Sequence, residues 1–134
     1  MMRGVVQRPL ELILARNLLA SLSTPAFLVD TEGEIAFYNE AAGGLLGRRF
    51  EETGPMPATE WTTTFGPFDE EGSPVRFDTL DITEALRGNR PAHDSFCIRS
   101  TDGTSHAIEA SGFPIVGAGG YRGAIIIFWP VEGS

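Results

Sequence analysis

The chain has few basic residues and only one cysteine. No lysine occurs among its 134 residues, so its ten basic residues are all arginine, against eighteen acidic residues and a net charge of −8. An acidic chain without a basic cluster is a poor match for nucleic acid or anionic lipid. Its single cysteine excludes an internal disulfide and a four-cysteine zinc site. With only two histidines and no acidic residues at ligand spacing, we expect no metal site.

Long apolar runs are also missing. None approaches the ~20 residues that a membrane helix needs, and Glu11 and Arg16 interrupt the apolar N-terminal stretch, which argues against a signal peptide. We therefore expect a cytoplasmic protein that does not contact membranes. Its length suits one domain with one core. We predict an N-terminal helical segment over residues 1–24, a domain over 25–131 and a tail at 132–134.

Residues 9–22 are expected to form a helix that is apolar on more than one side. Pro9 suits a first helical position. The leucine and isoleucine side chains then reach around most of the circumference, so this helix needs more than one apolar neighbour. One interpretation is packing against its own domain alone; the other, which we favour, adds contact with a second copy of the chain. The candidate dimer contacts are Leu10, Ile13, Leu14 and Leu18.

A hairpin and a capped helix are expected next. Apolar residues 26–29 and 35–38 flank a stretch with turn chemistry, which predicts two antiparallel strands. Asn39 is expected to cap a short helix over 40–46 that ends at a glycine. Four prolines limit residues 48–80 to short helical turns and loops.

Three strands are expected in the C-terminal third, over residues 95–100, 104–113 and 121–129. The last of them contains the continuous apolar run 125–128, which is typical of a central strand that is covered on both faces. This order of elements favours an α+β fold. It consists of one five-stranded antiparallel sheet with short helices packed on one face, plus the N-terminal helix.

The turn Thr101-Asp102-Gly103 predicts the register of the long hairpin. With Gly103 left-handed, residue 98 pairs with 106, 96 with 108 and 94 with 110. One face of the hairpin is then apolar and the other polar. The apolar face carries Phe96, Ile98, Ile108 and Ala110, with His106 on the same side, and the polar face carries Cys97, Arg99, Glu109 and Ser111.

Two short motifs stand in this order of elements. The first has the spacing D-x-x-G-x-I-x-x-x-N-x-x-A and consists of Asp30, Gly33, Ile35, Asn39 and Ala42. The second covers residues 80–88. Together with the Asp-Gly turn and Pro114 beyond it, these motifs resemble those of the PAS domain family over residues 10–131. In that family's pattern L-P-x-x-x-A-L-x-G, Asp81 replaces the proline and is expected to cap a helix that ends at Gly88.

The resemblance implies a non-enzymatic sensory or regulatory module. In this family a ligand, where one binds, lies between the concave face of the sheet and the short helices, so a small apolar or aromatic ligand is expected there. The candidate lining residues are Trp61, Phe65, Leu80, Leu86, Phe96, Ile98, His106, Ile108, Ala110, Ala124, Ile126 and Phe128. In the alternative interpretation these side chains fill one another's space, and the module is a ligand-free scaffold for protein–protein contacts.

Neither haem nor flavin is expected, and the cofactor stays unknown. Haem-binding members of the family take their ligand from the helix before the long hairpin, and residues 82–87 contain no histidine. His106 is therefore interpreted as a hydrogen-bonded residue at the pocket rim. The flavin-binding relatives carry a reactive cysteine in a motif like N-C-R-F-L-Q, which is missing here. Cys97 is instead expected to lie buried under the N-terminal helix.

The chain departs from the family at its C-terminal end. Residues 130–132 stand where PAS domains of larger sensors have D-[IV]-T, and with Met1 at the start this is consistent with a complete short protein. Its signal would then pass to other chains: a second copy in a homodimer, and a separate signalling protein. A small enzyme of similar topology is the weaker alternative, with Asp94, His106 and Tyr38 as its candidate residues.

Overall fold

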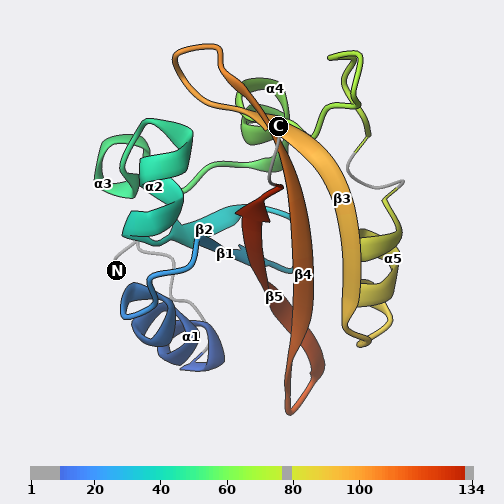
Figure 1. The fold of residues 1–134 in the computed structure, drawn as a ribbon. Helices are drawn as coiled ribbons and strands as arrows, with labels where there is room; N and C mark the ends of the chain where they lie inside the picture. Colours follow the sequence, from blue (N-terminus) through green and yellow to red (C-terminus); the bar gives the residue numbers. More distant parts are fainter. Residues whose placement is uncertain (1–9, 77–79, 132–134) are drawn as a thin grey trace.

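The computed structural model describes residues 10–76 and 80–131, so Pro9 and the expected tail lie outside the described residues. Within these two ranges ten elements follow one another, and they confirm the expected order (Figure 1). They are α1 (Leu10–Ala20), β1 (Ala26–Asp30), β2 (Ile35–Tyr38), α2 (Glu40–Leu46), α3 (Phe50–Thr53), α4 (Ala58–Thr64), α5 (Asp81–Arg87), β3 (Ala92–Arg99), β4 (Ser105–Gly117) and β5 (Gly120–Pro130).

The five strands form one antiparallel sheet in the order β2-β1-β5-β4-β3, so β5, which carries the apolar run 125–128, is the central strand, as expected. The hairpin register is also confirmed. Ile98 pairs with His106, and the two other predicted pairs, 96 with 108 and 94 with 110, are present as well. Gly103 has the left-handed φ of +88° that this turn requires. The strands run longer than predicted, since the pairing of β4 with β5 continues past Pro114 to the hairpin at Gly117.

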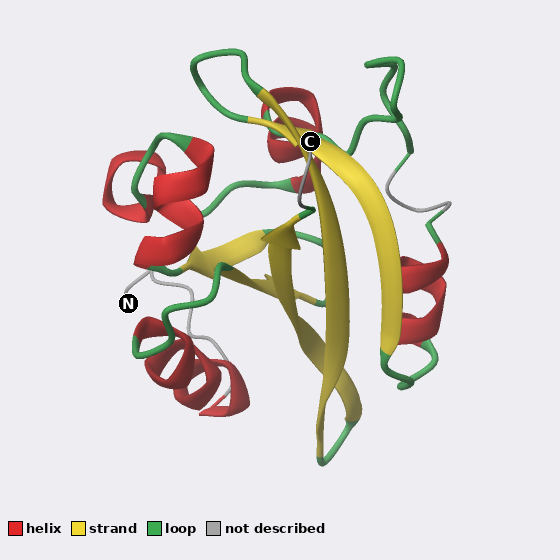
Figure 2. Ribbon diagram, in the orientation of Figure 1, coloured by secondary structure: helices red, strands yellow, loops and turns green. Residues whose placement is uncertain are grey.

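The two faces of the sheet carry different layers. Side chains alternate along a strand, and on β5 this directs Ala124, Ile126 and Phe128 toward α4 and α5. The opposite face of the sheet supports α1, whose buried residues are Leu12, Ala15 and Leu19. Figure 1 shows α1 and α5 on opposite sides of β4 and β5, and Figure 2 shows the same layers coloured by structure type.

The close approach of α1 to the sheet depends on a glycine. Gly123 has φ +143°, and a Cβ built on it would lie 2.4 Å from the carbonyl oxygen of Val29 and 3.2 Å from the Leu12 side chain. A larger residue would clash with the neighbouring backbone and adopt a strained conformation. The absence of a side chain here therefore lets Leu12 rest directly on the strands.

Asn39 caps α2 as predicted, and the helix ends at Gly47 in the left-handed conformation. The cap of α5 differs from the prediction. The carbonyl of Leu80 accepts the first bonds of that helix, from the amides of Thr83 and Glu84. Leu80 is therefore the N-cap residue and Asp81 the first residue of the helix.

The expectation that Cys97 lies under the N-terminal helix is wrong. Cys97 is buried, but on the edge strand β3, where its backbone exchanges two hydrogen bonds with Phe68, of 2.8 and 2.9 Å. The loop after α4 therefore covers this edge. The helix α1 packs mainly on β1, β2, β4 and β5. Among the described residues, no helix combines the length and apolar character needed to cross a membrane.

Candidate functional site

An apolar gap lies between the concave face of the sheet and α4. Aromatic and branched aliphatic side chains from the sheet face Trp61 of α4 and Phe65, which directly follows that helix. The lining residues are Phe27, Ile35, Trp61, Phe65, Gly66, Pro67, Phe96, Ile98, Ile108, Ile126 and Phe128. Seven of them belong to the pocket predicted from the sequence, and we call this space the inner gap.

The side chains around the inner gap nearly fill it. Its volume is about 30 Å³, close to the share of one water molecule in the liquid, whereas small-molecule sites enclose roughly 300–1,000 Å³. The rings of Phe27 and Phe128 lie 4.7 Å apart between centroids. The indole Nε1 of Trp61 donates a 2.9 Å hydrogen bond to the carbonyl of Gly33, which fixes that ring across the opening. In this conformation the gap has no room for an organic ligand.

The other predicted pocket residues lie outside the inner gap. Leu86 and Ala124 line a separate space of about 20 Å³ beside α5. Leu80 lines an open hollow outside β3. Ala110 is fully buried in the core, and His106 is half-buried on β4, next to the hairpin turn. The residues predicted to line one pocket are therefore divided among separate spaces.

Four lining residues of the inner gap were not predicted. Phe27 and Ile35 come from the first hairpin, and Phe27 pairs with Ile126 in the sheet. The alternation of β1 would have identified Phe27 once β1 was placed beside β5. Gly66 and Pro67 come from the loop after α4, and no local pattern indicates that this loop closes the gap.

The lining of the inner gap does not fit haem or flavin chemistry. The residues that line it include no histidine, cysteine, methionine or tyrosine that could serve as an axial haem ligand or as a reactive thiol. Cys97 faces away from the gap, on the other side of β3 from Phe96 and Ile98. A planar cofactor would need most of the aromatic side chains displaced.

The residues named for an enzymatic alternative do not converge. Tyr38 lies on β2 and Asp94 on β3, at opposite edges of the sheet. The Tyr38 hydroxyl donates a 2.6 Å hydrogen bond to the carbonyl of Arg48, and burial raises its pKa. Among the described residues, no three histidine, cysteine or acidic side chains gather where they could hold a metal ion.

His93 lies on the outer face of the sheet with an exposed side chain. One ring nitrogen, Nε2, is 3.1 Å from a carboxylate oxygen of Glu109, and Nδ1 is 3.2 Å from the hydroxyl of Ser111. Both nitrogens are therefore engaged by neighbours on β4. The pairing of β3 with β4 explains this arrangement, since His93 pairs directly with Ser111.

Comparison with known proteins identifies the fold. No protein-family model and no curated protein matches the chain. Among solved structures, a PAS domain from Colwellia psychrerythraea is 19% identical, with a TM-score of 0.63 over 92% of this chain and 98% of that one. The LOV protein of Rhodobacter sphaeroides is 12% identical, with a TM-score of 0.71 over 92% and 69%.

A third similar structure is the PAS domain of a nitrogen regulation protein from Vibrio parahaemolyticus. It is 16% identical, with a TM-score of 0.61 over 88% of this chain and 98% of that one. These structures match the chain over nearly its whole length, and they share the five-stranded sheet with short helices that its motifs had indicated. The chain therefore has the fold of the PAS domains.

Proposed function

We propose that the chain is a non-catalytic regulatory module of signal transduction that acts as a homodimer through α1. The main observation that supports this proposal is that one side of α1 packs on the sheet while another side exposes apolar residues to solvent. Similar structures include PAS domains of a two-component sensor histidine kinase and of a nitrogen regulation protein, which supports a role in signalling. The proposal includes a cytoplasmic location and a separate signalling protein that receives the signal.

The exposed side of α1 has the pattern of a helix–helix contact. Leu10, Leu14 and Leu18 follow one another at four-residue spacing, and Ile13 lies beside them. These side chains are 65%, 59%, 56% and 45% exposed, whereas the buried leucines of the same helix are at most 2% exposed. A contiguous apolar surface of this kind marks an interaction site. The same surface of a second copy would cover it in a two-fold symmetric contact.

Native mass spectrometry and sedimentation equilibrium of the full chain test this proposal. The wild type is expected at twice the monomer mass. The double variant L14E/L18E is expected at the monomer mass, because two carboxylates would be buried against an apolar surface. The control is Val116→Glu, which places one such carboxylate on an exposed apolar residue of the β4–β5 hairpin.

A wild type that is monomeric throughout would overturn the homodimer. A dimer that L14E/L18E leaves intact, and that Val116→Glu dissociates, would also do so and would assign the contact to the sheet. Circular dichroism of each variant verifies that its fold is retained. Because Leu14 and Leu18 are exposed, we expect L14E/L18E to retain its fold.

Ligand sensing at the inner gap is a second candidate function. Its wholly apolar lining favours an apolar or aromatic ligand, and such a ligand would bind a conformation in which the rings of Trp61 and Phe128 have moved apart. Native mass spectrometry of freshly purified protein tests this as well. A discrete extra mass would support a sensor, and bare polypeptide mass would favour the ligand-free scaffold.

A further inference from the structure

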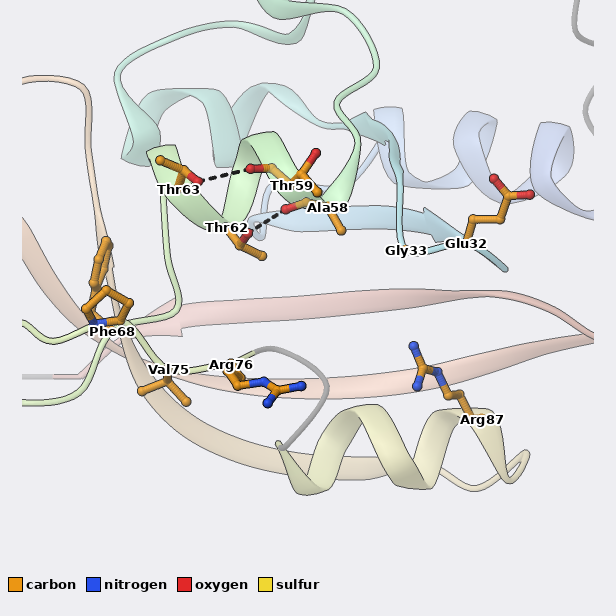
Figure 3. Close-up of a pocket in the computed structure, with 11 residues that line it drawn as sticks. Glu32, Gly33, Ala58, Thr59, Thr62, Thr63, Phe68, Val75, Arg76 and Arg87 are labelled. Carbon is orange, nitrogen blue, oxygen red and sulfur yellow. Dashed lines mark hydrogen bonds between the residues drawn. The ribbon is translucent and has the colours of Figure 1, made fainter.

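An open hollow lies beside the edge strand β3, and we call it the edge hollow. Its volume is about 420 Å³, far larger than that of the inner gap. The loop between α4 and α5 forms one wall through Phe68 and Val75, and β3 contributes Cys97. Figure 3 shows Phe68 and Val75 where they also border the neighbouring hollow between α4 and α5. That neighbouring hollow carries Arg76 and Arg87, whereas the edge hollow has a different charge.

The loop after α4 covers the edge of β3 at Cys97 but not nearer the start of the strand. The amide and the carbonyl of Cys97 both bond to Phe68, so they point away from β4. Main-chain groups two residues apart on a strand point the same way, which directs those of His93 and Ser95 to the same edge. The loop leaves them uncovered, because the chain reverses direction in the turn over residues 69–73.

The main chain of His93 and Ser95 is therefore open to a partner strand. Among the described residues, the amide and carbonyl of His93 and the carbonyl of Ser95 have no hydrogen-bond partner at this edge. The amide of Ser95 bonds to the carboxylate of Asp94 at 2.8 Å. An open sheet edge accepts an extended peptide as an added strand, and apolar pockets beside the edge bind alternate side chains of that peptide.

Carboxylates surround the edge hollow. Asp69, Glu70 and Glu109 line it, and the described residues of its lining include no arginine. Arg99 lies close by on β3, but its guanidinium stacks on the ring of Phe68, 4.1 Å from the centroid. The hollow thus combines an apolar wall with a negatively charged rim.

Each of these carboxylates keeps an oxygen for a cation. Glu70 is exposed. Among the described residues, Glu109 contacts only Nε2 of His93, through one oxygen, and Asp69 accepts two amides of its own turn through one oxygen. In a chain with a net charge of −8, this rim favours a partner that carries positive charge.

We propose that the edge hollow and the free edge of β3 bind an extended basic segment of a partner protein. The segment adds a strand at His93 and Ser95, with apolar side chains in the hollow and basic side chains at the carboxylates. This inference goes beyond the proposed homodimer, since self-association through α1 uses another surface. Either proposal can therefore fail alone.

Titration of the full chain with the capped pentapeptide Arg-Val-Arg-Val-Arg, followed by ¹⁵N NMR, tests the proposal. The peptide is expected to slow hydrogen exchange of the His93 amide and to shift the resonances of Ser95 and Glu70. The same peptide with an N-methylated main chain keeps its charge but lacks hydrogen-bond donors. It is expected to bind at least about tenfold more weakly, since it loses main-chain hydrogen bonds to the edge.

Variants of the chain test the role of charge. Glu70→Gln is expected to weaken binding of the pentapeptide by about two- to fivefold, the typical worth of one exposed ion pair. Glu51→Gln removes the same charge from an exposed position of α3, outside the hollow, and is expected to bind as the wild type does. L14E/L18E is also expected to bind as the wild type does, which separates this proposal from the homodimer.

Four results would overturn the proposal. The first is that the pentapeptide leaves exchange of the His93 amide unchanged. The second is that the N-methylated peptide binds equally well, because charge alone would then account for binding. The third is that the acidic counterpart Glu-Val-Glu-Val-Glu binds equally well. The fourth is protection of the His93 amide that rises with protein concentration without any peptide, which would assign the edge to a second copy of the chain.

Discussion

At the tip of the β3–β4 hairpin, one carboxylate organises the turn. The same oxygen of Asp102 accepts hydrogen bonds from the Ser100 hydroxyl and, at 2.9 Å, from the Thr104 amide. The hydrogen bond from Ser100 is the largest cause that lowers the pKa of Asp102 to about 2 from an ordinary value of 3.8. Because the folded pKa lies below the unfolded one, the ionised carboxylate stabilises the turn above the unfolded pKa. This contribution is lost as the pH falls through the folded pKa.

Removing the Ser100 hydroxyl is therefore expected to raise the pKa of Asp102 toward its ordinary value. A ¹³C NMR titration of the Asp102 carboxyl in the wild type and in Ser100→Ala measures this shift. Ser95→Ala is the control, since Ser95 lies earlier on β3. An unchanged pKa in Ser100→Ala would show that the backbone amide alone accounts for the shift.

At the scale of elements, the side chain of Asn39 joins three of them. Its oxygen accepts from the amide of Ala42, which caps α2, and from the amide of Ala26 at the start of β1. Its amide group donates to the carbonyls of Leu19, at 3.1 Å, and Thr24, at 2.8 Å. The buried Asn39 thereby ties the end of α1 to the hairpin and to α2.

Asn39→Ala is expected to lower the free energy of unfolding by about 2–4 kcal/mol, since it leaves several buried backbone groups without a partner. Asn17→Ala, on the exposed surface of α1, is expected to cost less than about 1 kcal/mol. Urea unfolding at one protein concentration measures both values. Equal losses would contradict the joining role of Asn39. The sequence predicted the cap but not the bonds to α1, because Leu19 lies twenty residues away.

The α1 helix shows a similar division between local and distant information. Its apolar residues predicted both a helix and the need for more than one neighbour, and the structure confirms the helix over Leu10–Ala20. Tertiary contacts decide which leucines face the sheet. Leu12, for example, packs next to Gly123, which lies more than a hundred residues further along the chain. The four residues predicted as dimer contacts are the ones that this packing leaves exposed.

At the scale of the whole molecule, the filled interior is the main structural property. Phe128 is fully buried on the central strand and lines the inner gap opposite α4. Phe128→Ala is expected to lower the free energy of unfolding by about 3–5 kcal/mol, through lost burial and the cavity that remains. Phe113→Ala makes the same change at an exposed position of β4, and is expected to cost less than about 1 kcal/mol.

Urea unfolding of both phenylalanine variants, at one protein concentration, measures this difference. Where Phe128→Ala folds, benzene is expected to bind the new apolar cavity and raise its stability. Similar losses in the two variants would mean that the interior is loosely packed. The inner gap would then accept a ligand more readily than its volume indicates.

By itself, the sequence determined the local structure of this protein. Alternating apolar residues, the left-handed Gly103 and the cap at Asn39 specified the strands, the hairpin register and a helix boundary. These features depend on residues within a few positions of one another. The motifs over residues 30–42 and 80–88 added the PAS resemblance, which the fold confirms.

Only the tertiary structure decided how large the inner gap is and where charge collects. The loop at Gly66 and Pro67 closes the gap, Phe68 covers Cys97, and Arg76 and Arg87 line one groove with α4. Each of these contacts joins segments that are distant in the chain. Their geometry depends on how side chains from different elements pack, and no local pattern of residues encodes that packing.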